Sequence, residues 1–259
     1  MEYKVRESMI GDGNQFHAVS FSGGKDSTAM LLGMLERSMP IDAIIFCDTG
    51  MEFPEMYDHI ALVEKRIQRQ ITRLKADVTF EYLMSEKPVS GTSRLGYMWP
   101  GPRTRWCTAR FKDEPSEGYL RTIGEGYSIV EYVGLAADET RRMERKCNRK
   151  ANKRHPLADW GMTEADALQY CYDLGFDWGG LYRYNKRVSC WCCPLQDLGR
   201  LRFLYRYHPA LWRRLRAMDD REIERGCRTF RPDYSVAELE RWFAAEEKQQ
   251  RLSLVEGKD

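Results

Sequence analysis

The segment "SFSGGKDST" near the N-terminus places two glycines, several hydroxyl side chains and one lysine directly after an apolar run. Gly23 and Gly24 allow a ligand to approach the backbone closely, and successive N–H groups at the start of a helix bind anions. Ser22 and Ser27 can donate hydroxyl hydrogen bonds, and Lys25 adds a positive charge. The segment therefore predicts a loop that binds phosphate.

This loop differs from the phosphate loop of kinases and related ATPases, which reads G-x-x-x-x-G-K-[ST]. The residue five positions before Gly24 is Val19, and Lys25 is followed by Asp26 rather than by serine or threonine. A plain glycine turn between a strand and a helix is the alternative interpretation. The complete string S-G-G-K-D-S after an apolar run favours the phosphate loop.

The chain contains eight cysteines, and three of them fall in the short string "SCWCCP". Cys190 and Cys193 form C-x-x-C, a spacing that lets two sulfurs reach one metal ion. The proline after Cys193 is typical of ferredoxin-type ligand runs, which favours an iron–sulfur cluster. Zinc bound by these thiols with Cys227 or His208, and no metal at all, are the alternatives that the spacing leaves open.

Four apolar runs predict the strands that position these residues: "HAVSFSGG", "IDAIIFCDTG", "ITRLKAD" and "SIVEYVGLAAD". Helical patterns separate them, so we expect an α/β fold with a parallel, Rossmann-like sheet and helices on both faces. Ligands of such sheets bind at the carboxyl ends of the strands. The strings "SGGKDS", "CDTGMEFPE" and "GLAADETRR" all lie at those ends, so their side chains should meet in one site.

The second half of the chain differs from the first in its residue patterns. "MTEADALQYCYDLG" predicts a helix opened by Thr163, the cysteine-rich string follows in a compact loop, and two further segments have helical patterns. "KPVSGTSRLGYMWPGPRTR" predicts a long loop of the kind that often carries function. We expect two domains: residues 1–156, which carry the phosphate loop, and residues 157–259, a C-terminal helical module that contains cysteines.

The composition is that of a water-soluble globular protein, with 31% charged and 42% hydrophobic residues and a net charge of +2. No apolar stretch approaches the roughly 20 residues that span a bilayer, and the N-terminal residues lack an apolar signal core. We therefore expect a cytoplasmic protein without a membrane partner, in which the thiols stay reduced. "RRMERKCNRKANKRH" and residues 200–231 are rich in arginine and lysine, which predicts either a nucleic-acid surface or solvated helix faces.

Five strings in a fixed order resemble a known family. "SGGKDS" resembles the SGGxDS signature of the PP-loop ATP pyrophosphatases, also called adenine nucleotide alpha hydrolases. "CDTGMEFPE", "RTRWCTARFK", "GLAADETRR" and "HPLADWGMTEADALQY" resemble motifs of the phosphoadenosine-phosphosulfate (PAPS) reductase family within that superfamily. The resemblance covers residues 16–194, so the chain is identified as a member of this family of nucleotide-binding α/β enzymes.

The resemblance implies an adenine nucleotide, ATP or PAPS, bound with Mg²⁺, and it implies roles for individual residues. The implied catalytic residues are Lys25, Asp26 and Cys107. Cys107 also becomes the third thiolate of a [4Fe–4S] cluster with Cys190 and Cys193, and Cys147 or Cys192 could complete the ligand set. The implied nucleotide-binding residues are Ser20, Ser22, Gly23, Gly24, Lys25, Asp26, Ser27, Asp48, Thr49, Gly134, Glu139 and Arg142.

The chain departs from the family pattern in two places. Ala136 stands where many members carry an arginine, so one expected phosphate or sulfate contact is missing. Assimilatory reductases use a cysteine in the C-terminal tail, whereas the last cysteine here is Cys227. These departures favour a sulfurtransferase that activates an acceptor, with nucleic acid as a candidate, and takes sulfur from a donor. A PAPS or adenylyl-sulfate reductase that releases sulfite and a non-catalytic binding module are the alternatives.

Overall fold

A parallel sheet of five strands forms the framework in a computed structural model, which describes residues 14–256 and the side chains up to residue 250. The strand order is β3-β2-β1-β4-β5, and every neighbouring pair is parallel. The strands are β1 (Gln15–Ser20), β2 (Ala43–Asp48), β3 (Thr72–Lys75), β4 (Ser128–Val133) and β5 (Lys153–Arg154). The predicted parallel α/β fold is confirmed.

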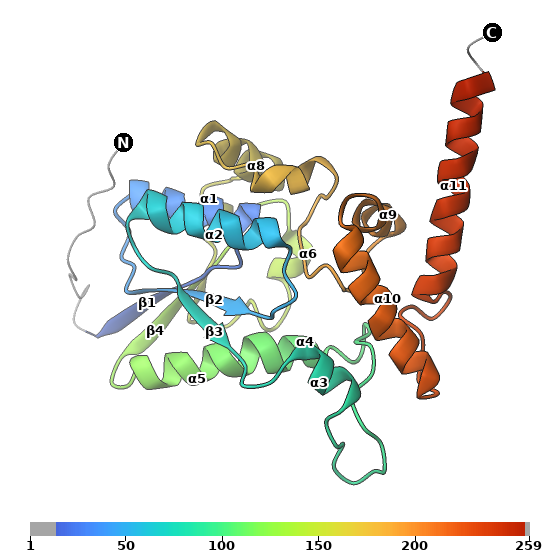
Figure 1. The fold of residues 1–259 in the computed structure, drawn as a ribbon. Coiled ribbons are helices and arrows are strands. Elements are labelled where there is room, and N and C mark those ends of the chain that lie inside the picture. The colour runs from blue at the N-terminus through green and yellow to red at the C-terminus, as the bar shows by residue number, and fades with distance from the viewer. Residues whose placement is uncertain (1–13, 257–259) are drawn as a thin grey trace. The chain divides into compact units, whose positions relative to one another are not determined.

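Helices cover both faces of this sheet (Figure 1). Helices α1 (Lys25–Glu36) and α2 (Pro54–Ile67) lie on one face, and α5 (Glu114–Ile123) lies on the other. The central strand β1 is accordingly apolar on both sides, and Ala18 and Val19 are fully buried. Side chains of α5 pack against Ala18 and its neighbours in β2. A strand that is covered on both faces reads as a continuous apolar run, which is why this pattern predicted it.

The remaining helical elements connect or extend this framework. Several of them are short, and η1 is a π-helical turn while η2 is a 3₁₀ segment interrupted by two glycines. They are α3 (Phe80–Ser85), α4 (Trp106–Thr108), η1 (Ala109–Asp113), α6 (Thr140–Met143), α7 (Pro156–Asp159), α8 (Glu164–Asp173), η2 (Trp178–Arg183), α9 (Leu198–Tyr207), α10 (Pro209–Glu224) and α11 (Val236–Glu256). None of the helices between residues 14 and 256 combines the length and the apolar character that crossing a membrane requires.

The order of the strands reverses at β1. The chain passes from β1 through β2 to β3 on one side, and β4 then pairs with the opposite edge of β1, with Ser20 beside Val133. The carboxyl ends of the neighbouring strands β1 and β4 therefore lie side by side, and each continues into a loop. Such a point is where open α/β sheets bind their ligands. Both the loop after β1 and the loop after β4 carry predicted site residues.

The chain divides into two compact units whose limits differ from the two expected domains. The first unit contains the described residues up to Ala76 together with Thr108–Val188, and the second contains Asp77–Cys107 and the residues from Ser189 onward. Helix α8, which follows the expected boundary at residue 156, packs against α1, and the buried Cys171 of α8 contacts the carbonyl of Lys25. The two units therefore follow contacts between segments that are far apart in the sequence.

Candidate functional site

The loop between β1 and α1 is closed by hydrogen bonds among its own residues. The Ser27 hydroxyl lies 3.0 Å from the Ser22 hydroxyl, accepts the Ser22 N–H and donates to the Gly24 carbonyl. Gly23 has a φ of +75°, and a Cβ there would lie 2.7 Å from the Met56 sulfur. Only glycine combines this conformation with this space. The loop that the sequence predicted is therefore a rigid turn at the N-terminus of α1.

Lys25 is the first residue of α1, and its side chain is turned into the protein rather than into solvent. Its exposure is 4%, and its Nζ donates to Asp26 Oδ1 at 2.6 Å and to Glu164 Oε1 at 3.1 Å. Glu164 opens α8, where its backbone N–H donates to the Asp138 carboxylate in the loop after β4. The β4 loop thus fixes the start of α8, and α8 presents its first carboxylate to Lys25.

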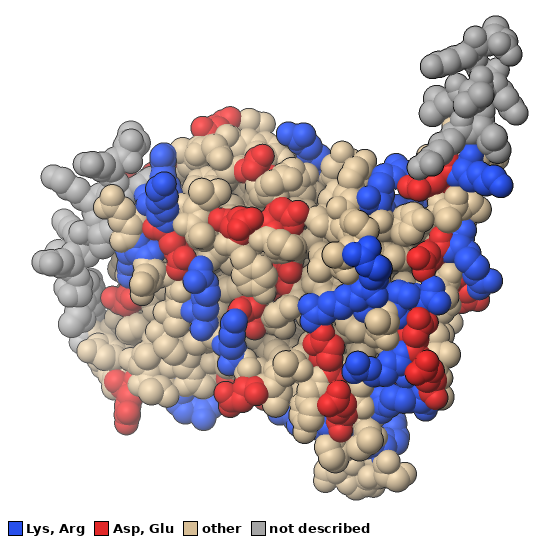
Figure 2. Space-filling view, in the orientation of Figure 1, with Lys and Arg blue, Asp and Glu red and all other residues tan. Residues whose placement is uncertain are grey.

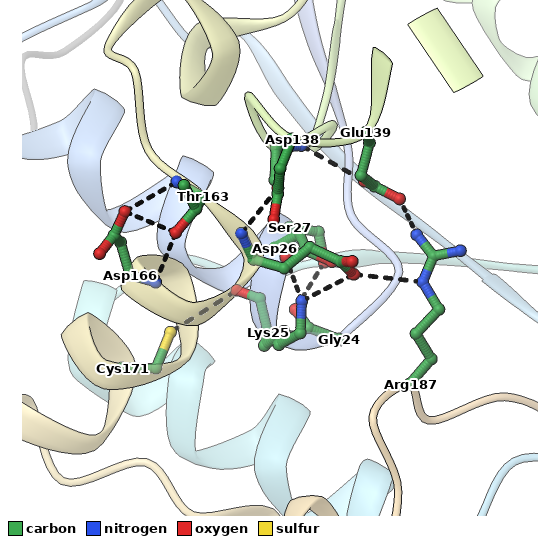
Figure 3. A network of polar contacts seen from close by, with 12 residues as sticks. Gly24, Lys25, Asp26, Ser27, Asp138, Glu139, Thr163, Asp166, Cys171 and Arg187 are labelled. Atoms are coloured by element: carbon green, nitrogen blue, oxygen red, sulfur yellow. Dashed lines mark hydrogen bonds and ion pairs between the residues drawn. The ribbon is translucent and has the colours of Figure 1, made fainter. Parts of the chain in front are cut away.

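Glu139, in the loop after β4, is the second carboxylate of this region (Figure 3). It is largely buried and contacts Arg142 at 2.5 Å, while its other oxygen accepts the Ala136 N–H at 3.3 Å. Arg187, from the loop after η2, contacts both Glu139 and Glu164. Two guanidinium groups therefore surround a carboxylate that faces the phosphate loop.

Asp26, Glu139 and Glu164 each bring one carboxylate oxygen within 4.8 Å of the other two. Burial is the main cause that raises the pKa of Asp26; the charge of Glu164 raises it further, whereas Lys25 and Arg187 lower it. Three carboxylates can share so small a volume only when cations compensate them. Carboxylate oxygens are the ligands that Mg²⁺ prefers, so this trio could hold a divalent cation in place of the amino and guanidinium groups.

Gly134 is required at the end of β4 because the backbone of the phosphate loop passes directly beside it. A Cβ at Gly134 would lie 2.9 Å from both Cα and N of Ser27 and 3.0 Å from the carbonyl carbon of Asp26. None of these three backbone atoms can move without shifting the first turn of α1. The lack of a side chain at Gly134 thus lets the loop after β4 approach the loop after β1.

Asp48, at the carboxyl end of β2, belongs to a separate cluster. Its carboxylate accepts hydrogen bonds from the Tyr57 hydroxyl at 2.7 Å and from the Gly50 N–H at 2.9 Å, and Lys75 lies 3.1 Å away. Burial alone would raise the pKa of Asp48, but these three partners outweigh it and lower the pKa. Asp48 therefore stays charged and shapes the turn after β2, where Thr49 bonds to Glu52.

Aromatic side chains of η2 support the phosphate loop, and sequence reasoning missed them. Trp178 Nε1 donates to the Gly23 carbonyl at 2.7 Å, and the Tyr182 hydroxyl accepts the Lys25 N–H at 2.8 Å. His59 stacks on Trp178 with the ring centres 4.3 Å apart, and burial lowers the pKa of His59 to about 3. The aromatic string "FDWGGLYRY" was the available signal.

The predicted metal ligands Cys107, Cys190 and Cys193 all lie in the second compact unit. Cys190 and Cys193 lie in one turn, in which the Cys193 N–H donates to the Cys190 carbonyl and Gln196 donates to the same carbonyl. Cys192 between them is 1% exposed. The turn thus buries Cys192 and leaves Cys190 and Cys193 partly exposed. Cys147 is exposed and belongs to the first unit.

The arginines of the second unit are largely neutralised by acidic side chains of the same unit (Figure 2). Arg202 contacts Glu246 at 2.7 Å, Arg206 contacts Glu247 at 2.9 Å, and Arg216 contacts Asp220 and Glu240. In the view of Figure 2, blue and red side chains alternate over this part of the surface. This pairing matches the alternative of solvated helix faces with interspersed acids. The segment of residues 141–155 belongs to the first unit, and most of its cations are exposed.

Comparisons with known proteins place these features in a family. Among curated proteins, two uncharacterised proteins of Methanocaldococcus jannaschii are similar to this chain. MJ0066 is 26% identical over 209 residues, which cover 75% of this chain and 39% of that protein. MJ0973 is 29% identical over 181 residues, which cover 68% of this chain and 40% of that protein. The chain thus spans about two fifths of the length of these relatives.

Among solved structures, the PAPS reductase from Candida auris in a phosphate complex is similar at a TM-score of 0.44 and 16% identity, over 71% of this chain and 84% of that one. The sequence model of the phosphoadenosine phosphosulfate reductase domain matches residues 17–196, from the central strand to just beyond the cysteine turn. That match covers more than half of the chain and includes all the motifs that carried the resemblance. The chain therefore belongs to the phosphoadenosine phosphosulfate reductase domain family.

Proposed function

We propose that the protein is a PP-loop enzyme that binds ATP with Mg²⁺, reacts at the alpha phosphate and supports the transfer of sulfur to an acceptor. The observation that carries the proposal is the position of Lys25. Its amino group lies at the N-terminus of α1, at the point where the strand order reverses, and contacts two of the three clustered carboxylates. Anion-binding and cation-binding groups therefore meet where a nucleotide polyphosphate would need both.

The phosphate loop supplies the groups that a leaving pyrophosphate requires. These groups are the backbone N–H groups at the start of α1, the Ser22 hydroxyl and the Lys25 amino group, all of which are hydrogen-bond donors. Cleavage at the alpha phosphate builds negative charge on the pyrophosphate, and donors fixed in advance stabilise that charge without reorganising. The rigid closure of the loop by Ser27 keeps these donors in place.

Asp26, Glu139 and Glu164 are the residues that would hold Mg²⁺. Three hard oxygen ligands with mutual distances within 4.8 Å fit this ion. When bound, Mg²⁺ would neutralise phosphate charge and act as a Lewis acid. The protein's part is to hold the three carboxylates close together, and the contacts with Lys25 and Arg187 compensate their charge.

Cys107, Cys190 and Cys193 are the residues that would hold a [4Fe–4S] cluster. Soft thiolates are its ligands, and the turn that buries Cys192 leaves Cys190 and Cys193 partly exposed. When bound, the cluster would supply iron with affinity for sulfur. Zinc on the same thiols is the alternative, and the sulfur donor is part of the proposal.

A nucleic acid is the acceptor class that we propose to test first. Residues 141–155 carry many exposed arginine and lysine side chains, and such a surface attracts a phosphate backbone. The paired arginines of α9 to α11 do not add to this argument, because their charge is already compensated.

The test is the conversion of ATP to AMP and pyrophosphate by anaerobically purified protein with Mg²⁺, sulfide and RNA or DNA. We expect turnover in the wild type and its loss in Asp26→Asn, with Asp58→Asn on the exposed side of α2 as the matched control. Tight ATP binding without turnover under any acceptor would contradict the proposal and favour a non-catalytic binding module. Iron and sulfide analysis of the same sample tests the cluster, and zinc without iron would contradict it.

Reduction of PAPS or adenylyl sulfate to sulfite is the second candidate, because residues 17–196 match the PAPS reductase domain. Release of sulfite from labelled PAPS with thioredoxin, in the absence of ATP turnover, would establish it. Turnover of ATP without sulfite release would eliminate it.

A further inference from the structure

Arg187 occupies an unusual position for an exposed arginine. Its guanidinium lies between two of the three clustered carboxylates: one nitrogen contacts Glu139 and Nε lies 3.3 Å from Glu164 Oε1. The exposed fraction of its side chain is nevertheless 42%. Figure 3 shows this side chain reaching from a loop toward Glu139. The sequence analysis assigned no role to this residue.

The backbone around Arg187 is tied to the phosphate loop itself. The Tyr182 hydroxyl accepts the N–H of Lys25 at 2.8 Å, and the same hydroxyl accepts the N–H of Val188. One hydroxyl thus joins the backbone beside Arg187 to the backbone at the start of α1. The residue next to Arg187 is thus linked to the first residue of α1, and the Arg187 side chain extends from this linked backbone to Glu139 and Glu164.

The charges of the site balance without a ligand. Three carboxylates, those of Asp26, Glu139 and Glu164, contact three cations, those of Lys25, Arg142 and Arg187. A polyphosphate brings several negative charges into this balanced group, so at least one cation must leave a carboxylate and turn toward the phosphate. Lys25 is buried at 4% exposure, whereas Arg187 combines exposure with a planar guanidinium that bonds two oxygens at once.

We propose that Arg187 is a phosphate-binding residue that exchanges Glu139 and Glu164 for phosphate oxygens on the pyrophosphate side of the nucleotide. This inference rests on the proposed function, since it requires a polyphosphate at the loop. It also accounts for Ala136, which is fully buried and leaves the loop after β4 without an arginine at that position. The guanidinium comes instead from Arg187, in a later segment of the chain.

The exchange has a consequence for the carboxylates. Once Arg187 turns away, Glu139 keeps Arg142 and Glu164 keeps Lys25, and both gain free oxygens that can bind a cation. Binding of the polyphosphate and of the divalent cation should then reinforce each other. Arg187 thereby compensates the carboxylate charge that a bound divalent cation would compensate.

The experiment compares the affinities of ATP, AMP and inorganic pyrophosphate for the wild type and for Arg187→Gln and Arg187→Lys. Loss of one charge-assisted contact should weaken ATP and pyrophosphate binding by about tenfold to a hundredfold in Arg187→Gln. Arg187→Lys should recover part of that loss, and AMP binding should change little. The matched control is Arg183→Ala, an exposed arginine of the preceding η2 segment, which should bind like the wild type.

Two outcomes would overturn the inference. One is ATP affinity in Arg187→Gln equal to that of the Arg183→Ala control. The other is an equal loss for AMP and ATP, which would indicate general damage to the site instead of a lost phosphate contact. Failure of the wild type itself to bind ATP or pyrophosphate would reject the proposed function, and the wild-type measurement therefore separates the two failures.

Discussion

The carboxylate of Asp219 and those of the first unit's cluster are satisfied in opposite ways. In the second unit, Asp219 is fully buried and accepts hydrogen bonds from the Phe230 N–H at 2.6 Å, the Val236 N–H at 2.7 Å and Trp99 Nε1 at 3.1 Å. In the first unit, the partners of Glu139 and Glu164 include long cationic side chains. Backbone and indole donors are fixed by the fold, whereas lysine and arginine side chains can rotate.

The difference teaches how to separate a structural carboxylate from a functional one. Burial raises the pKa of both Asp219 and Asp26, so the direction of the shift alone does not distinguish them. The partners do. Asp219 stabilises the start of α11 with neutral donors that have no second role, while Asp26 shares its cation with a neighbouring carboxylate. A group held by exchangeable charges is prepared for a charged ligand.

The largest expected effect tests the structural side of this comparison. Asp219→Ala leaves two backbone N–H groups and one indole N–H buried without an acceptor, each of which costs about 1 to 3 kcal/mol. We expect a loss of roughly 3 kcal/mol or more in the free energy of unfolding, measured by urea denaturation.

The neighbouring residue gives the control for this change. Asp220→Ala removes an exposed ion pair with Arg216, which contributes at most about 1 kcal/mol. Equal losses for the two variants would show that the fixed donors of Asp219 have no special importance.

Lys25→Ala tests the functional side. Removing one preorganised charge from a site where negative charge develops lowers turnover by about a hundredfold to a thousandfold. We expect this loss in the rate of AMP formation from ATP, with Lys65→Ala on the exposed side of α2 unchanged. Turnover within a factor of about three of the wild type would remove Lys25 from the site.

Gly134→Ala tests whether the two loops of the site must touch. The new Cβ would lie 2.9 Å from backbone atoms of Ser27, and such overpacking costs about 1 to 3 kcal/mol. We expect lower stability together with weaker ATP binding, because relief of the contact displaces the phosphate loop.

Gly118→Ala in α5 is the matched substitution, since a Cβ there meets nothing within 4 Å and alanine favours a helix. It should be neutral or slightly stabilising by thermal unfolding. ATP binding that is equal in the two glycine variants would contradict the close approach.

Asp26→Asn should give the smallest effect on stability, and its sign is informative. Because the folded protein raises the pKa of Asp26 above 3.8, this residue favours the folded state below that pH and loses that contribution as the pH rises through its folded pKa. At neutral pH we therefore expect Asp26→Asn to be at least as stable as the wild type, although it loses turnover.

The pH dependence of unfolding completes that test. The difference between Asp26→Asn and the wild type should vanish when the pH falls below 3.8, where both side chains are uncharged. A wild type that is clearly more stable than Asp26→Asn at neutral pH would place Asp26 with Asp219, among the structural carboxylates.

The sequence by itself determined the parallel sheet, the glycine turn between β1 and α1, the family and the capping of α8. Each depends on local patterns: apolar runs ended by glycine, the string S-G-G-K-D-S, and Thr163, whose side chain accepts the Asp166 N–H as predicted. Such signals lie within a few residues of one another and can be read without knowing what packs where. The roles of Cys107, Cys190 and Cys193 stay predictions.

Only the tertiary structure decided which residues surround Lys25. Glu164 is 139 positions away in the chain and Tyr182 is 157 positions away. No local pattern around either residue indicates that it contacts Lys25. The structure also placed residues 77–107 in one compact unit with the C-terminal helices, against the order of the chain. The physical reason is the same in both cases: burial of side chains against distant segments, rather than any local pattern, determined which groups meet.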